Sequence, residues 1–444
     1  MRGDAWLDVG ACARDLGKRV ELDQVAPQAP PKGLLALMGP GLITGASVDD
    51  PSGIATYSQA GAQFGTAMCW VVLFCYPLMI AIQEISARIG CVTGRGIAGN
   101  LQQYYSRWLS WPFVVLLLGA NITNLGADLG AMADAVHLLI GGPAHLYVVS
   151  LALGCILLEM FSRYDRYVNI LKWTSLSLFA YVATALVVGV DWLAVAHDTF
   201  VPNFSLKTEY VTTFVGVLGT TITPYCFFWQ SSQEAEDMRV YPAAQSLLEH
   251  LEQAPAAMRR MRIDTYLGMA YSNLISLFII VTAAATLHAH GITGIQTTAQ
   301  AAEALRPIAG AFTFYVFAAA IIGIGLLAIP VLAGSSAYVL GEALGWTTGL
   351  GHRPVDAKPF YGAIAVATLV GIGINFVGVD PIKALFWSAA LNGVVAAPLM
   401  VMIMLMAMQP RVMGRFTLPL PLFIMGWVST LTIAVSVLIM FAMW

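Results

Sequence analysis

Charge is scarce in this 444-residue chain. Only 11% of its residues are charged, against about 25% in a typical soluble domain, while 58% are hydrophobic and the mean hydropathy is +0.74. This composition excludes a soluble globular protein and predicts an all-α polytopic membrane protein embedded in the lipid bilayer. The formal net charge is −3 and no dense basic block is present, so nothing indicates a nucleic-acid partner.

Catalytic and metal-binding motifs are missing as well. The six cysteines show neither CxxC nor Cys/His zinc spacing, which predicts neither a disulfide framework nor structural zinc. The sequence contains neither HExxH nor a Ser/His constellation, so we expect no enzyme and no cofactor. No feature indicates an obligate protein partner. The seven histidines all fall in loops or at predicted helix ends, which leaves no imidazole in the membrane core.

Long apolar stretches are what the sequence has instead. A window of about 19 residues marks helices long enough to cross about 30 Å of hydrocarbon. It predicts eleven spans, at 33–62, 66–91, 112–139, 146–162, 167–190, 210–231, 261–288, 310–341, 359–377, 382–407 and 417–442. We therefore expect one transmembrane domain over 33–442 after a cytosolic N-terminal segment over 1–32. The connections 191–209 and 232–260 leave room only for short surface helices.

The distribution of lysine and arginine predicts the orientation. If the N-terminus is cytosolic, 19 of the 22 basic residues lie on the inside, and the exceptions are Lys207, Arg306 and Lys383. The positive-inside rule then places the C-terminus outside. Residues 1–32 contain no apolar h-region, which argues against a signal peptide and favours a multi-pass protein of the cell (inner) membrane.

The first span is interrupted near its middle. Segment 45–54 reads GASVDDPSGI, so Asp49 and Asp50 lie at bilayer depth beside Pro51 and Gly53. A carboxylate there is costly unless it faces a cation or a cavity, and the proline and glycine break the helix. The segment predicts an unwound helix that holds a cation through Asp50. Asp49 is either a second ligand, a partner for waters on the ion, or a hydrogen-bond acceptor for free backbone amides.

A second interruption lies in span six, where 216–225 reads GVLGTTITPY. Spans one and six run in opposite directions, and paired breaks indicate two inverted repeats with a site at the midplane. We expect five-helix repeats over about 33–190 and 210–407, with an extra helix at 417–442. The hydroxyl of Thr223 and the carbonyl of Thr220 are candidate ligands, although a Thr223 hydroxyl that only caps its own helix is equally expected.

These segments resemble the natural resistance-associated macrophage protein (NRAMP) family. The resemblance rests on Gly39-Pro40-Gly41, Asp50-Pro51-Ser52-Gly53, Ala55-Thr56, Gln59 and the stretch QEISARIGCVTGRG at 83–96. It implies a LeuT-type fold, with ten helices in two inverted repeats plus an extra helix or two. It also implies transport of Mn²⁺, Fe²⁺ and related divalent ions, usually together with protons.

The departures from the family pattern concern the metal ligands. The family break Asp-Pro-Gly-Asn keeps its carboxylate here as Asp50, but Gly53 stands at the asparagine position. In the sixth-helix break Met-Pro-His, Thr223 replaces the methionine and Tyr225 the histidine. Thioether sulfur suits soft metals, whereas carboxylate, hydroxyl and water suit hard cations. The sequence thus favours Mg²⁺ and/or Mn²⁺ and is similar to the NRAMP-related magnesium transporters.

Proton coupling is expected to be weak or absent. Asp128 matches the first acid of a family pair on helix three, but the second is Ala131, and Tyr225 takes the place of the family histidine on the proton route. Asp134, one turn on, is a candidate replacement. The ion gradient and the inside-negative potential, worth about 2.3 kcal/mol per charge per 100 mV, would then drive import.

Other polar residues in the spans have two interpretations each. Asn392 lies about one turn from Ala389, which stands at a family glutamine position, and either completes the metal shell or joins two helices. Cys226 is either a thiolate ligand or a small buried hydrophobe. Glu84 and Arg88 are expected to form a structural ion pair. Three acidic residues follow span six and form either an acidic exit vestibule or a solvated helix face: Glu234, Glu236 and Asp237.

Two alternative functions stay open. One is an ordinary proton-coupled Mn²⁺/Fe²⁺ importer. The other is a Na⁺-coupled small-solute symporter on the same fold, in which Asp49 and Asp50 would hold Na⁺.

Overall fold

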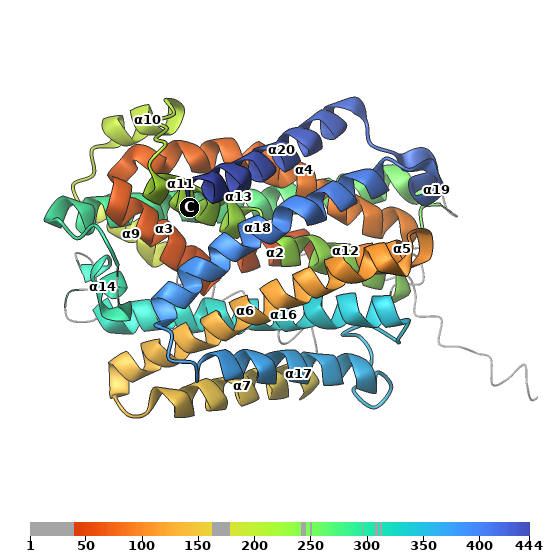
Figure 1. The fold of residues 1–444 in the computed structure, drawn as a ribbon, viewed down its shortest axis with the longest axis horizontal. Helices are drawn as coiled ribbons and strands as arrows, with labels where there is room; N and C mark the ends of the chain where they lie inside the picture. The colour runs from red at the N-terminus through yellow and green to blue at the C-terminus, as the bar shows by residue number, and fades with distance from the viewer. Residues whose placement is uncertain are drawn as a thin grey trace, which may run out of the picture. The chain divides into compact units, whose positions relative to one another are not determined.

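The computed structural model describes residues 40–161, 178–240, 246–248, 251–295, 297–306, 310 and 313–444. Within these residues the regular secondary structure is helical throughout (Figure 1). The predicted cytosolic segment 1–32 and the first half of the predicted fifth span lie outside the described residues.

The long apolar helices support a multi-pass integral membrane protein. Among the described residues, seven stretches have the length and hydropathy to cross a bilayer, and two shorter apolar helices cover Ala144–Met160 and Lys358–Ile374. The seven stretches are Pro51–Thr93, Arg107–Ile140, Thr208–Met238, Leu251–His290, Phe314–Leu344, Pro381–Ala407 and Leu420–Met443.

The helices of the N-terminal half are α2 (Pro40–Val48), α3 (Pro51–Phe64), η2 (Gly65–Met68), α4 (Cys69–Thr93), α5 (Ile97–Tyr104), α6 (Arg107–Ile140), α7 (Ala144–Phe161), α9 (Phe179–Val187) and α10 (Trp192–Phe200). Those of the C-terminal half are α11 (Thr208–Thr221), α12 (Pro224–Val240), η4 (Leu251–Gln253), α13 (Ala254–Thr286), η5 (His288–His290), α14 (Thr298–Glu303), α16 (Thr313–Leu344), α17 (Lys358–Ile374), α18 (Pro381–Ala407), α19 (Pro410–Met413), η7 (Gly414–Phe416) and α20 (Leu420–Met443).

Several helices extend beyond the predicted apolar spans. Helix α12 continues to Val240 and α13 already begins at Ala254, where the prediction placed a connection at 232–260. The added turns carry Glu234, Asp237 and Arg260, whose polarity ends a hydropathy window but does not end a helix. For these two helices hydropathy therefore located the apolar core and missed the polar ends.

The predicted break in the first span is present. Helix α2 ends at Val48 and α3 begins at Pro51, with Asp50 in an extended conformation (φ −60°, ψ 172°) as the N-cap of α3. The Asp50 carboxylate accepts a hydrogen bond from the Gly53 amide at 2.8 Å. Pro51 lacks the amide hydrogen that a first-turn residue would leave unpaired, so the local sequence itself specifies the start of α3.

The second predicted break separates α11 from α12. Ile222 has φ −110° and ψ 69°, outside the helical region, and α12 starts at Pro224. The Thr223 hydroxyl donates to the Thr220 carbonyl, and the Cys226 amide donates to the Thr223 carbonyl at 3.2 Å. The freed backbone groups beside the break are thus partly paired within the turn.

Close helix contacts fix both interrupted helices. A Cβ at Gly45 of α2 would lie 2.2 Å from the Gly268 carbonyl oxygen of α13, and one at Gly219 of α11 would lie 2.1 Å from the Ala389 carbonyl oxygen of α18. Only glycine allows these backbones to meet. On another side of the bundle, α6 packs along α16 and α7 along α17 (Figure 1).

Candidate functional site

The Asp50 carboxylate lies in the gap between α2 and α3 and is 1% exposed. Its Oδ1 accepts hydrogen bonds from the Ser52 hydroxyl at 2.6 Å and the Gly53 amide at 2.8 Å. Its Oδ2 accepts from the Asn124 side-chain amide at 2.8 Å and the Tyr225 hydroxyl at 3.2 Å. Asp50 therefore joins the first break to α6 and to the first turn after the second break.

Asn124 connects three of the predicted site residues. Its Nδ2 donates to Asp50 and lies 3.5 Å from the Asp128 Oδ2, while its Oδ1 accepts from the Asn392 side-chain amide at 3.4 Å. The structure thus brings Asp50, Asp128 and Asn392 together. Asn124 was not predicted, although Asn121, Asn124 and Asp128 recur at helical spacing along one face of an apolar helix, a signal that could have identified it.

Two buried carboxylates in this cluster lack a basic partner. Asp128 is fully buried, and its Oδ1 makes no hydrogen bond. In the described part of the chain, neither Asp50 nor Asp128 forms an ion pair with Lys, Arg or His. Because buried negative charge is costly without compensation, the pair is suited to a cation between or beside the two groups.

Gly53 and Thr220 face each other across the two breaks. A Cβ at Gly53 would lie 3.1 Å from the Thr220 Oγ1 and 3.3 Å from the Val48 carbonyl oxygen. The Thr220 hydroxyl is buried and has no hydrogen-bond partner. The Thr223 hydroxyl, in contrast, donates a hydrogen bond to the Thr220 carbonyl oxygen. This bond occupies one lone pair of the carbonyl oxygen, which is itself a candidate ligand. At the second break, Thr220 and Thr223 therefore offer oxygen atoms, and no thioether sulfur, as candidate ligands.

Tyr225 connects α12 to the first break. Its hydroxyl lies 2.6 Å from the Ser47 carbonyl oxygen and 3.2 Å from the Asp50 Oδ2, and its side chain is fully buried. The single phenol proton is shared between these two acceptors, and the shorter contact is to the Ser47 carbonyl.

Asp49 faces a different helix from Asp50. Its Oδ1 accepts hydrogen bonds from the hydroxyls of Ser272 and Ser276 on α13, at 3.2 and 3.1 Å. Its Oδ2 is buried and has no partner. The structure does not place Asp49 among the groups that contact Asp50, and no sequence pattern indicated the two serines.

Several other candidate residues lie in separate contacts. Asp134 accepts a hydrogen bond from Thr298 of α14, away from Asn124. Glu236 accepts from the Tyr338 hydroxyl and, at 2.6 Å, from the Gly351 amide, and so caps the turn before α17. Asp237 pairs with Arg260 at 3.2 Å, and Glu234 is buried at 3% exposure. The described contacts of Glu236 and Asp237 are thus structural.

The predicted ion pair on α4 is confirmed and extended. Glu84 lies 3.9 Å from Arg88, but its closer partners are Arg262 at 2.7 Å and the Tyr266 hydroxyl at 2.6 Å. Cys226 is 1% exposed, with its sulfur 3.8 Å from the Ser47 hydroxyl oxygen. Ala389 is buried and contributes its backbone to the packing of α11 on α18.

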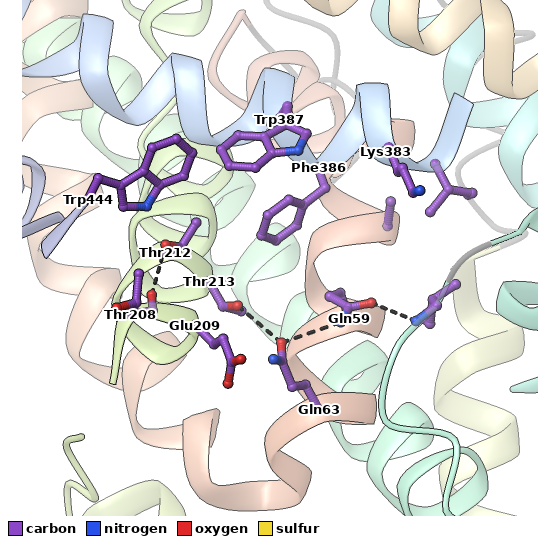
Figure 2. A pocket seen from close by; sticks show the side chains of 13 residues that line it. Gln59, Gln63, Thr208, Glu209, Thr212, Thr213, Lys383, Phe386, Trp387 and Trp444 are labelled. Carbon is purple, nitrogen blue, oxygen red and sulfur yellow. Dashed lines mark hydrogen bonds between the residues drawn. The ribbon is translucent and has the colours of Figure 1, made fainter. Parts of the chain in front are cut away.

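A cavity of about 410 Å³ opens beside the C-terminal part of α3. Figure 2 shows Gln59 and Gln63 on one wall, Thr213 and Glu209 of α11 beside them, and three aromatic side chains of α18 and the C-terminus above (Phe386, Trp387 and Trp444). The Gln63 side-chain oxygen accepts from Gln59 and Thr213, at 3.4 Å each (Figure 2).

None of the residues that line the cavity belongs to the carboxylate cluster. At Gly216 of α11, a Cβ would lie 3.3 Å from the Thr56 methyl group and 3.7 Å from the Phe386 ring. These three residues bring α3, α11 and α18 together, and Phe386 also lines the cavity. Since Asp50 is 1% exposed, the structure represents a state in which the carboxylate cluster is occluded.

Among the described residues, no group of three or more His, Cys, Asp or Glu side chains could hold a metal ion. The cluster offers two carboxylates and neutral oxygens of amide, hydroxyl and carbonyl groups. Such donors suit a hard cation that keeps part of its water shell better than a soft transition metal.

Two solved structures share the fold. A manganese transporter of Eremococcus coleocola, solved with an aromatic bis-isothiourea substituted compound, aligns with a TM-score of 0.70 at 18% identity, over 94% of this chain and 89% of that one. Mhp1, a nucleobase-cation-symport-1 family transporter in a closed conformation, aligns with a TM-score of 0.51 at 14% identity, over 91% and 92%. The expected LeuT-type fold is thereby confirmed.

Sequence comparison gives the family. The chain is 28% identical over 403 residues to the divalent metal cation transporter MntH of Klebsiella pneumoniae (strain 342), covering 89% of this chain and 91% of the relative. It is 29% identical over 370 residues to MntH of Chromohalobacter salexigens, covering 79% and 78%. The model of the natural resistance-associated macrophage protein-like family matches residues 41–443, and the chain belongs to this NRAMP family.

Proposed function

We propose that this protein is a secondary transporter that imports a hard divalent cation, Mg²⁺ and/or Mn²⁺, by alternating access, with weak or no proton coupling. The metal ion is the substrate, and no resident cofactor is proposed. Family membership and the names of the relatives, divalent metal cation transporters, support divalent transport in general. The choice of ion and the absence of coupling rest on the residues of the site.

One observation carries the proposal: the Asp50 carboxylate, buried in the first helix break, is linked through Asn124 to a second buried carboxylate, that of Asp128. Together the two carboxylates supply the charge that balances a divalent ion. Neither has a basic partner among the described residues, so a cation is the compensating group that the site lacks.

The neutral groups around Asp50 explain how an ion would enter. Asn124 and Tyr225 now donate to the Asp50 Oδ2, and a cation at this oxygen replaces one or both donors. Rotation of the Asn124 amide presents its oxygen to the ion, because an amide carries a donor and an acceptor on the same group. The unpartnered Thr220 hydroxyl lies across from Gly53 and adds a further oxygen.

The missing side chains favour a hydrated ion. Gly53 and Thr223 stand where the family pattern has asparagine and methionine, so two direct ligands are replaced by space and a short hydroxyl. Mg²⁺ sheds its waters reluctantly and takes oxygen ligands, which suits such a site. We assign the ligand set to Asp50, the Thr220 carbonyl or hydroxyl, and waters held by Thr223, Asn392 and Asp128.

Access alternates about the two breaks. We assign the cavity of Figure 2 as the outer vestibule and the contact of Thr56, Gly216 and Phe386 as the layer that opens toward it. The positive-inside pattern supports this orientation, with the N-terminus cytosolic in the inner membrane. Import is then driven by the gradient and the membrane potential.

The side chains along α6 and α12 support weak or absent proton coupling. Ala131 and Tyr225 replace the second acid and the histidine, and the six described histidines are exposed, outside the cluster. The runner-up is an ordinary proton-coupled Mn²⁺/Fe²⁺ importer, which the relatives named divalent metal cation transporters also support.

The test is uptake into proteoliposomes with Mg²⁺, Mn²⁺ or Ca²⁺ outside and a pH dye inside. We expect saturable Mg²⁺ or Mn²⁺ uptake, competition between the two ions, and no acidification of the lumen. Asp50→Ala should abolish uptake while the protein keeps its gel-filtration profile, and Asp356→Ala, in an exposed loop, should leave it unchanged. Saturable Mn²⁺ uptake that acidifies the lumen and is not competed by Mg²⁺ would establish the runner-up.

A further inference from the structure

We propose that Asp49, Ser272 and Ser276 form a second cation site, distinct from the divalent site, which binds a single monovalent metal ion of the Na⁺ type. The site lies between the end of α2 and α13. The site is independent of which divalent ion Asp50 binds, because no described side chain donates to both carboxylates.

Asp49 is an incompletely paired buried charge. Its side chain is 0% exposed, and only Oδ1 has hydrogen-bond partners, the hydroxyls of Ser272 and Ser276. Its Oδ2 has none, whereas each Asp50 oxygen receives two donors. In the described part of the chain Asp49 forms no ion pair with a basic side chain. A carboxyl group buried in this way is either neutralised by a proton or balanced by a bound cation, because an uncompensated charge there has a large free-energy cost.

The groups around Asp49 are oxygens. Ser272 and Ser276 are one turn apart on α13, so both hydroxyls reach the same carboxylate. The Tyr57 hydroxyl adjoins Ser276 and lies 2.9 Å from the Thr221 hydroxyl, which places two further oxygens on this side of the break. Hydroxyl groups accept as well as donate, and can turn their lone pairs to an ion.

The charge of the groups around Asp49 determines which class of ion this site binds. One carboxylate and neutral hydroxyls balance a single positive charge, so a divalent ion would leave an excess charge in a buried site. All the described groups that contact Asp49 are hard oxygens, and the Cys226 sulfur lies 3.8 Å from the Ser47 hydroxyl oxygen. A small alkali cation satisfies both conditions.

The partners of the two carboxylates also lie on different helices. Asp49 bonds to α13, whereas Asp50 bonds to Asn124 of α6 and Tyr225 of α12. The α2 backbone is in turn anchored to α13 by Asp264, whose carboxylate accepts from the Gly41 amide at 2.6 Å and the Leu42 amide at 3.2 Å. An ion at Asp49 would therefore strengthen the α2–α13 contact without occupying the divalent site.

The experiment is ²²Na⁺ binding to the purified full-length protein in a choline buffer free of Na⁺, Mg²⁺ and Mn²⁺. We expect saturable binding by the wild type. Asp49→Asn, and the double variant Ser272→Ala/Ser276→Ala, should weaken it by at least about tenfold, roughly 1.4 kcal/mol, because they remove the charge or two of its oxygens. Asp50→Asn should weaken it by less than about tenfold, because it removes a neighbouring charge but no group that contacts Asp49. Ser429→Ala, at a buried serine of α20, is the matched control and should bind as the wild type does.

Absence of saturable Na⁺ binding in the wild type would overturn the proposal. So would binding that is lost in Asp50→Asn but kept in Asp49→Asn. Gel filtration of each variant separates loss of the site from loss of the fold. The result is independent of the divalent proposal, since a failure of Mg²⁺ and Mn²⁺ uptake leaves wild-type Na⁺ binding measurable.

Discussion

Asp49 and Asp50 are consecutive in the chain, yet their carboxylates bond to different helices. The Asp49 Oδ1 contacts two serines of α13, and the Asp50 Oδ2 contacts Asn124 of α6. The backbone between them has left the helix, which ends at Val48, so the side chains no longer follow the angular spacing of a helix. Two neighbouring charges can thus belong to separate sites.

Replacing Asp128 by Asn should weaken the binding of the divalent cation. The substitution keeps the side-chain volume but removes one of the two charges that Asn124 brings together, and we expect the apparent KM for Mg²⁺ to rise by about tenfold, or 1.4 kcal/mol. The apparent KM is measured from uptake as a function of Mg²⁺ concentration. Asp134→Asn is the control, since Asp134 bonds to Thr298 and should leave the KM unchanged. Equal effects of the two variants would contradict the assignment of Asp128.

A methyl group at position 53 should reduce the space for the ion between Gly53 and Thr220. In Gly53→Ala the new Cβ would approach the Thr220 Oγ1 to 3.1 Å, and we expect Mg²⁺ uptake to fall by about tenfold. Adding Thr220→Ala removes the atom that it meets, so the double variant should recover part of the loss, a coupling that a mutant cycle measures.

Gly119→Ala is the matched control for that substitution, because a Cβ at Gly119 would meet nothing within 4 Å. Strictly additive effects of Gly53→Ala and Thr220→Ala would show that the two residues do not face the same space.

A thioether at the second break should change the ion preference. Thr223→Met places sulfur where the family pattern has it, so we expect Cd²⁺ to compete about tenfold better against Mg²⁺. Competition in the uptake assay measures the ratio. Thr223→Leu has a similar volume but no sulfur and should not raise Cd²⁺ competition. An identical ion profile for both variants would mean that position 223 does not face the ion.

The packing of α2 on α13 should depend on Gly45. In Gly45→Ala the Cβ would lie 2.2 Å from a backbone carbonyl of α13, which cannot move as a side chain can. We expect a destabilisation of about 1–3 kcal/mol or more, measured as a lower melting temperature in detergent. Gly154→Ala, on α7 with nothing within 4 Å, should be neutral or slightly stabilising. A melting temperature of Gly45→Ala equal to that of wild type would contradict the tight contact.

Much of the fold was predictable because a bilayer imposes strong rules on sequence. The positions of the spans follow from hydropathy, and the breaks at Asp49–Asp50 and Ile222–Thr223 follow from proline and glycine beside polar residues. The polar ends of α12 and α13 were missed because hydropathy reports the membrane core and not helix formation.

The site was predicted less completely. Asp50, Asp128 and Asn392 were identified separately, but their common partner Asn124 was not, since the spacing of polar residues on one helix does not say which break they face. Thr223 was left between two interpretations, and in the occluded state its hydroxyl bonds to Thr220.

By itself the sequence determined that the chain spans a membrane with two interrupted helices and carries a carboxylate at the first break, because hydrocarbon tolerates such polar groups only where function requires them. The tertiary structure alone decided which helix each carboxylate faces. That direction depends on the backbone of the unwound segment and on the serines of α13 and the asparagine of α6, which are distant in sequence and meet Asp49 and Asp50 only when the helices pack.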